Sequence, residues 1–300
     1  MVCKNRKELK FALYLLTLFF LLASCASTPK PETFYQGRSG FGLMPEGAPL
    51  NLTAEVKSVR PILDSLNLGG MTGAEIKDFL DRSDTLTIAV YEIPGQRHFY
   101  AAATGRFPNT SSGIFFSASS EWEKKTSASG MPYWYSARSW LAVSLTSREA
   151  YLSDVDPFVP PPGATVPEAL PAMQRGAVLY GWMNDPSQAI NRLITTFNIP
   201  IEIPAERLLF AVHPAAQGQY YAVLRFETPT ATQAAALVRV FAMAKLGMAL
   251  ADFSEREEME ALARALFANN PTQDGSSFII QTGPMDGKDI ALLFNTMSVY

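Results

Sequence analysis

Cysteine and histidine are scarce in this chain of 300 residues, which contains two of each. So few cysteines exclude a disulfide scaffold and a cysteine-rich zinc module. So few histidines leave little material for a histidine-based metal site or a Ser-His-Asp triad. We therefore expect the protein to hold no metal ion and no cofactor.

Basic charge and catalytic motifs are lacking as well. The formal net charge is −3, so the chain has no excess of lysine and arginine of the kind that nucleic-acid-binding proteins carry. The sequence contains no Gly-x-Ser-x-Gly, P-loop or His-Glu-x-x-His motif. These absences favour a protein that is not an enzyme and has no nucleic-acid partner.

The first 24 residues have the organisation of a bacterial signal peptide. A basic segment at residues 4–10 is followed by an apolar run at residues 11–22. At 1.5 Å per residue such a run extends about 18 Å, well short of the ~30 Å hydrocarbon core of a bilayer. The segment is therefore expected to target the chain rather than to span a membrane.

Leu22-Ala23-Ser24-Cys25 follows this run and resembles the lipobox of bacterial lipoproteins. The resemblance implies cleavage before Cys25, a thioether bond from its sulfur to a group that carries two acyl chains, and often a further acyl chain, such as palmitate, on the new N-terminus. Two or three acyl chains anchor a protein stably, whereas one binds only marginally. Membrane lipid, held through acylated Cys25, is thus the expected partner. An ordinary secretory signal with an incidental cysteine is the alternative.

Cleavage would remove four basic residues and one acidic residue, changing the net charge from −3 to −6. Such a chain has no overall attraction to anionic headgroups, so any further membrane contact would be apolar. Ala26 stands where Asp would, by resemblance to enterobacterial lipoproteins, favour retention in the inner membrane. We therefore expect the periplasmic leaflet of the outer membrane, facing the periplasm.

Proline and glycine divide the remaining chain. Residues 25–46 are expected to form a tether, and the proline-rich residues 154–172 a linker. They separate a first α+β repeat at residues 47–153 from a second at residues 173–300. We expect an α+β fold of two tandem related halves, each an antiparallel sheet covered by helices.

An internal repeat is indicated by a hairpin pattern that recurs in both halves. The alternative is a chance similarity between two common hairpins. A second strand pair is expected to close each half, with a helix from Ser147 after the first pair. The expected strands are residues 86–91, 98–103, 133–137 and 141–145, then 208–213, 219–224, 277–281 and 290–294.

Two helices are expected late in the chain. Residues 254–268 form an amphipathic pattern that begins with the capping-box pair Ser254 and Glu257. Residues 231–250 are apolar almost all round, which fits either a core helix or a helix that docks on a membrane. Exposed tryptophans would suit the same contact. The candidate membrane or amphiphile contacts are Leu237, Val240, Phe241, Met243, Ala244, Leu246, Trp134 and Trp140.

The lipobox, the repeated α+β halves and the apolar helices together resemble the membrane-inserting outer-membrane lipoproteins of treponemes. That resemblance implies a closed soluble form and an open form integrated in the membrane. The alternative function is a periplasm-facing binding or assembly module whose partner is an envelope protein or polymer.

The lipobox generates the first prediction. Cys25→Ser should abolish acylation and move the protein from the membrane fraction to the soluble fraction, because no acyl chain remains to hold it. Cell fractionation and intact-mass analysis test this. An unmodified Cys25 in the mature wild-type protein would contradict the assignment.

Overall fold

The fold is described by a computed structural model. The residues of the predicted signal peptide and predicted lipobox, and Ser254 of the predicted capping box, lie outside the described residues. The structure describes residues 40–65, 73–93, 96–107, 116–127, 131–156, 163–196, 203–248 and 257–297.

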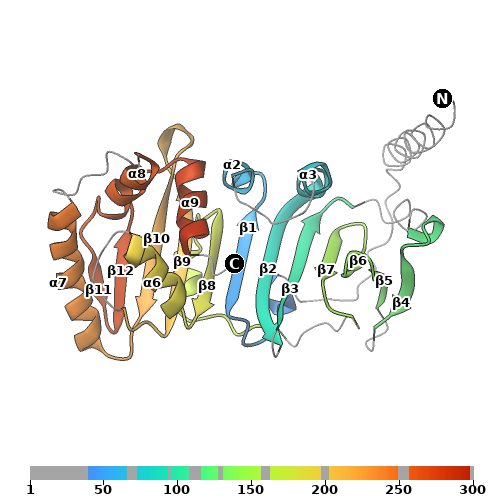
Figure 1. Ribbon diagram of the computed structural model, residues 1–300, viewed down its shortest axis with the longest axis horizontal. Helices are drawn as coiled ribbons and strands as arrows, with labels where there is room; N and C mark the ends of the chain where they lie inside the picture. The colour runs from blue at the N-terminus through green and yellow to red at the C-terminus, as the bar shows by residue number, and fades with distance from the viewer. Residues whose placement is uncertain are drawn as a thin grey trace, which may run out of the picture.

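One continuous sheet forms the body of the protein (Figure 1). Among the described residues it has twelve strands, and each neighbouring pair is antiparallel. Their order across the sheet is β11-β12-β10-β9-β8-β1-β2-β3-β7-β6-β5-β4. The strands are β1 (Leu50–Glu55), β2 (Ser83–Ile93), β3 (Gln96–Gly105), β4 (Glu123–Thr126), β5 (Pro132–Ser136), β6 (Leu141–Leu145), β7 (Glu149–Ser153), β8 (Leu179–Asn184), β9 (Arg207–Pro214), β10 (Tyr220–Glu227), β11 (Thr272–Asp274) and β12 (Ser277–Gln281).

The prediction of a separate sheet in each half is wrong, because β1 and β8 pair with one another at the centre, with Asn51 opposite Trp182. Each strand would otherwise leave an unpaired edge, and pairing satisfies the backbone groups of both. Outward from this joint the order is β1-β2-β3 on one side and β8-β9-β10 on the other. Matching strand order is what a duplication would produce, and the duplication itself stays a prediction.

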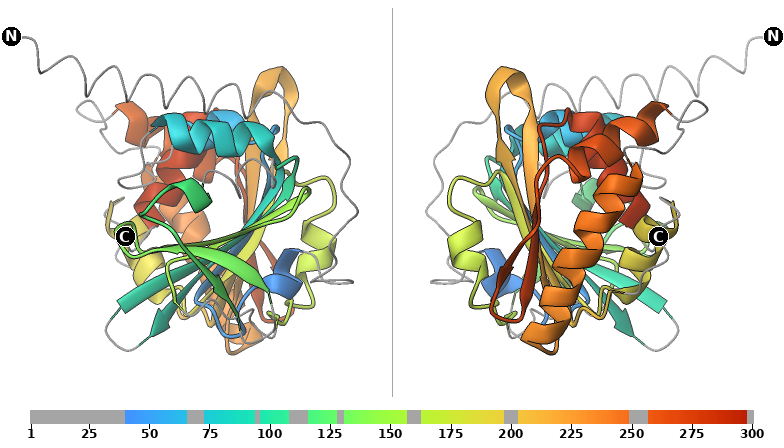
Figure 2. Two further views of the ribbon diagram at one scale, coloured as in Figure 1. Left: turned by 90° about the vertical axis from the view of Figure 1, so that its right-hand side faces the viewer. Right: turned by 90° about the vertical axis from the view of Figure 1, so that its left-hand side faces the viewer.

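Most helices gather on one face of the sheet, as Figure 2 shows. The main hydrophobic core lies between this face and the helices, and includes Ile62, Leu208 and Leu293, all with no exposed surface. The covering helices are α2 (Arg60–Leu63), α3 (Gly73–Arg82), α6 (Ser187–Thr196), α7 (Ala231–Met248), α8 (Glu257–Leu266) and α9 (Gly287–Met297).

A second, smaller core lies on the opposite face, where η1 (Gly40–Leu43) and α5 (Leu170–Met173) pack (Figure 2). Met44 and Leu170 are fully buried there. The prediction of a tether is therefore wrong for residues 40–46, because apolar side chains fix them to the sheet. The end of the predicted linker, residues 163–172, also packs on this face: the Ala164 N–H donates to the Phe41 carbonyl at 3.1 Å.

A short 3-10 turn, η2 (Ala216–Gly218), joins β9 to β10.

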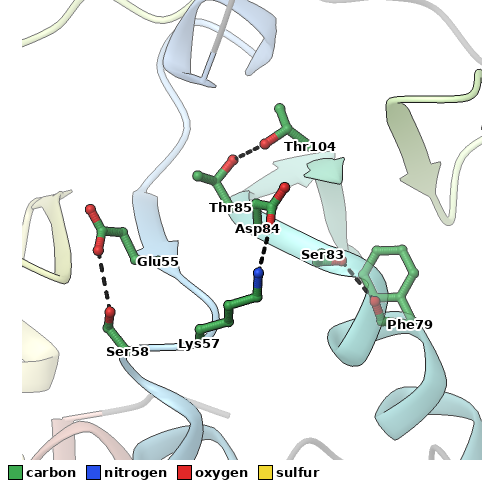
Figure 3. A network of polar contacts seen from close by, with 8 residues as sticks. All are labelled: Glu55, Lys57, Ser58, Phe79, Ser83, Asp84, Thr85 and Thr104. Atoms are coloured by element: carbon green, nitrogen blue, oxygen red, sulfur yellow. Dashed lines mark hydrogen bonds and ion pairs between the residues drawn. The ribbon is translucent and has the colours of Figure 1, made fainter. Parts of the chain in front are cut away.

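Polar contacts fix the turn between β1 and the helices that follow it (Figure 3). Lys57 and Asp84 form an exposed ion pair at 3.0 Å, and the Val56 N–H donates to the Asp84 carbonyl. The Ser83 hydroxyl donates to the Phe79 carbonyl at 2.8 Å, which joins the end of α3 to the start of β2. These bonds set where α3 ends and β2 begins.

Two predicted elements closing the halves are wrong. Residues 290–294 lie in helix α9 because Asp286 caps it: its Oδ1 accepts the N–H groups of Lys288 and Asp289 at 2.8 and 2.9 Å. The helix expected from Ser147 is strand β7, which fills the space between β3 and β6. The cap outweighed the local sequence pattern at residues 290–294, and pairing with β3 and β6 outweighed it at β7.

The central pair generates a stability prediction. A Cβ at Gly181 would overlap the Asn51 carbonyl oxygen and lie 2.7 Å from the Leu52 Cα. Because both atoms are backbone of β1, Gly181→Ala should destabilise the fold by ~3 kcal/mol. Gly218→Ala, at a turn with φ +74° and open space around it, is the control and should cost only ~1 kcal/mol. Equal losses in chemical denaturation would contradict this account of the joint.

Candidate functional site

Helix α7 is the candidate functional site, and it is well formed at its N-terminus. The Thr230 hydroxyl oxygen accepts the Gln233 N–H at 3.2 Å, and the same hydroxyl donates to the Gln233 side chain at 3.0 Å. This is a capping arrangement that satisfies a backbone group otherwise left open. The helix lies at one end of the molecule, against β11 and β12 (Figure 1).

One side of α7 packs into the main core. Leu237 is buried, and the ring of Phe241 stacks on Phe267 with centroids 4.4 Å apart and meets the edge of Phe278 at 5.5 Å. Towards its C-terminal end Lys245 Nζ donates to the Ala268 carbonyl at 3.0 Å. These contacts hold the helix to the sheet and to the segment after α8.

The other side of α7 presents apolar side chains to solvent. Met243 is 70% exposed and Leu246 is 72% exposed, whereas most large apolar side chains of the described residues are buried or half-buried. Ala236 and Ala242 are exposed beside them. Exposed apolar residues gathered on one element mark interaction sites more often than scattered ones do.

The structure thus divides the helical residues predicted as contacts. Leu237, Phe241 and Ala244 pack against the core, and Val240 is half-buried. Of the predicted helical contacts, only Met243 and Leu246 have largely exposed side chains that could contact a partner. Among the described residues, no helix combines the length and the apolar character needed to cross a membrane.

The two predicted tryptophans belong to β5 and to the turn after it, and β5 lies at the end of the sheet opposite α7 (Figure 1). The structure therefore does not bring them to α7. Trp134 is half-buried on β5, with its ring 5.6 Å from Phe116 and Lys124 Nζ 5.8 Å from its centroid. Trp140, in the turn between β5 and β6, is 69% exposed. Trp134 is therefore a packing residue, and Trp140 is available for contact.

Ionisable groups cluster on the sheet face opposite the main core, at the start of the proline-rich segment of residues 154–172. Asp156 accepts Lys125 Nζ at 2.6 Å and the Tyr133 hydroxyl at 2.7 Å. Burial alone would raise the pKa of Asp156, but these two bonds outweigh it and lower the pKa below its usual value. The hydrogen bond to Asp156 raises the pKa of Lys125 in turn. The cluster ties residue 156 to β4 and β5.

The nearby His98 also serves to hold this segment. Its Nδ1 lies 3.2 Å from Asp154 Oδ2, while the Phe99 N–H donates to Asp154 Oδ1 at 2.9 Å. His213 lies in β9, where burial lowers its pKa. Across the described ranges, no three His, Cys, Asp or Glu side chains come together as a metal site would require.

A small cavity that the sequence did not reveal lies at the joint of β1 and β8. It has a volume of about 200 Å³ and is lined partly by Asn51, Trp182, Asn184 and Arg207. Both asparagine amides donate to the Ala48 carbonyl, at 3.1 and 3.0 Å, and Arg207 Nε donates to Asn184. The lining also includes Trp182 and Ala164, and Asn51 Oδ1 is buried without a hydrogen-bond partner among the described residues, so the cavity combines polar and apolar surface.

The two sides of α7 generate a prediction. Phe241→Ala should destabilise the protein by about 3 kcal/mol, because it removes a half-buried ring that packs on Phe267 and Phe278. Met243→Ala, two residues further on, should change stability by less than about 0.5 kcal/mol since most of that side chain is exposed to solvent. Denaturation in urea measures both. A large loss in Met243→Ala would show that this side of the helix is not free.

Neither a protein-family model nor a curated protein matches the sequence. Solved structures of the treponemal protein TP0453 do match the fold. Crystal form I is 16% identical with a TM-score of 0.58, covering 88% of this chain and 99% of that one. Crystal form IV is 15% identical with a TM-score of 0.58 and the same coverage. The chain therefore shares the fold of TP0453, which agrees with the treponemal resemblance at the level of the fold.

Proposed function

We propose that this protein is a lipid-anchored, non-catalytic protein of the bacterial envelope that contacts the membrane through α7. The observation that carries the proposal is the outward side of α7, where Met243 and Leu246 are exposed on a helix that the core already holds in place. Water is an unfavourable environment for such side chains, and a bilayer removes them from it.

The strength of this contact fits an anchored protein. Complete burial of a side chain such as Met or Leu stabilises by ~1.5–3 kcal/mol, so two of them bind a membrane only weakly. Acyl chains on Cys25 would hold the domain near the bilayer and raise its effective concentration there. In this arrangement the anchor supplies the affinity, and α7 sets which side of the domain faces the lipid.

The shared fold supports the comparison with treponemal envelope proteins, and Ala26 after the lipobox supports the periplasmic leaflet of the outer membrane. A free amphiphile is the second ligand that the same apolar surface would accept. The alternative, a periplasm-facing assembly module, would use the same surface for an envelope protein.

Flotation with phosphatidylcholine vesicles tests the proposal on the mature chain carrying Cys25→Ser, which lacks acyl chains. The double variant Met243→Glu, Leu246→Glu should bind about tenfold more weakly or worse, because each carboxylate must be desolvated. The control Ala261→Glu adds a carboxylate at an exposed position on α8 and should float as the parent does.

Circular dichroism should show the same folded state for all three proteins. If the parent stays at the bottom of the gradient, or if the double variant and the control float equally, the membrane contact is wrong. Retention of an envelope protein by the parent but not by the double variant would then favour the assembly module.

A further inference from the structure

Exposed apolar side chains and unpaired arginines occur together in this protein. The large apolar side chains exposed in the described residues are Trp140, Val166, Met243 and Leu246. Three of these four share an element or turn with an exposed arginine: Met243 and Leu246 with Arg239, and Trp140 with Arg138. A partner that fits these places would need both an apolar region and an anionic group.

Neither arginine has an acidic partner. Arg239 and Arg138 form no ion pair among the described residues, whereas Arg60, Arg207 and Arg225 each pair with a carboxylate. Helix α7 contains no Asp or Glu, and neither do residues 137–140. In a chain with more acidic than basic residues, α7 therefore has a locally positive charge, whereas beside the β5–β6 turn the Glu121 carboxylate accepts the Ser136 hydroxyl at 3.2 Å and forms no ion pair with Arg138 among the described residues.

We propose that these are two contact points for anionic lipid headgroups, each with an arginine for the phosphate and apolar side chains for the acyl region. The inference rests on the proposed membrane contact and names its lipid class. A guanidinium donates two parallel hydrogen bonds to phosphate oxygens, which an apolar contact alone cannot supply.

The spacing of residues on α7 fits an arginine at the phosphates and apolar side chains among the acyl chains. Arg239, Met243 and Leu246 stand at i, i+4 and i+7, so they lie on one face of the helix. Seven residues at 1.5 Å place Arg239 about 10 Å before Leu246 along the axis. A helix inclined with its C-terminal half deeper would put Met243 and Leu246 among acyl chains and leave Arg239 at the phosphates.

Trp140 forms the second contact. Its φ of +52° is a left-handed conformation that disfavours a bulky residue, and its ring packs on little since it is 69% exposed. Stability gives no reason for tryptophan here, but the headgroup region of a bilayer is where tryptophan side chains concentrate. Arg138 lies two residues earlier in the same turn.

The overall negative charge does not oppose these contacts. At ~0.1 M salt the Debye length is ~10 Å, so a headgroup responds to the arginine beside it more than to distant carboxylates. Each basic residue at an anionic surface strengthens binding about fivefold. α7 and the β5–β6 turn lie at opposite ends of the sheet, so the two contacts act independently, and their effects multiply when one vesicle surface meets both.

The test compares vesicles of phosphatidylcholine with vesicles containing roughly one third phosphatidylglycerol, again with the Cys25→Ser chain. The parent should prefer the anionic vesicles about twenty-five-fold, and Arg239→Gln and Arg138→Gln should each lower that preference about fivefold. Arg148→Gln, in another exposed turn, and Arg264→Gln, on α8, remove the same charge and should leave the preference unchanged.

Several outcomes would overturn the proposal. Equal binding to both vesicles would refute the headgroup contact and leave the apolar contact standing, whereas binding to neither would refute both. Equal losses in all four variants would show a net-charge effect without specific sites. A loss in only one of the Arg239 and Arg138 variants would refute the two-point arrangement.

Discussion

The antiparallel pairing of β1 with β8 is the interaction on which the rest of this structure depends. It joins two sets of strands into one sheet, in which Gly181 allows the two backbones to approach at the centre. Because an antiparallel pair keeps the faces of its strands continuous, the helices of both halves cover the same face. The main core, the smaller core opposite it and the cavity at the joint all follow from that arrangement.

The same arrangement determines what remains exposed. A sheet this wide has two distant ends, and α7 lies at one of them with neighbours on a single side. Its inner residues fill the core, while Met243 and Leu246 have no further layer to cover them. The available surface of α7 is therefore a consequence of its place at the end of the fold.

Much of the fold followed from sequence pattern. The strands at residues 141–145 and 277–281 have the predicted bounds, because alternation within a half-buried sheet is a direct signal. Pattern could not show that β1 and β8 pair, since that contact joins residues more than a hundred positions apart. Nor could it separate Phe241 from Met243 on a helix that is apolar almost all round. Only the packing of Phe267 and Phe278 decides which side is buried.

The most direct measurement of the central claim is the depth of residue 243 in a bilayer. The mature chain with Cys25→Ser has no cysteine, so Met243→Cys provides a single labelling site, with Ala261→Cys on α8 as its control. After vesicles are added, a fluorophore at 243 should shift to the blue and become protected from an aqueous quencher, while one at 261 should not change. Equal accessibility at the two positions, with the protein bound to the vesicles, would contradict the account.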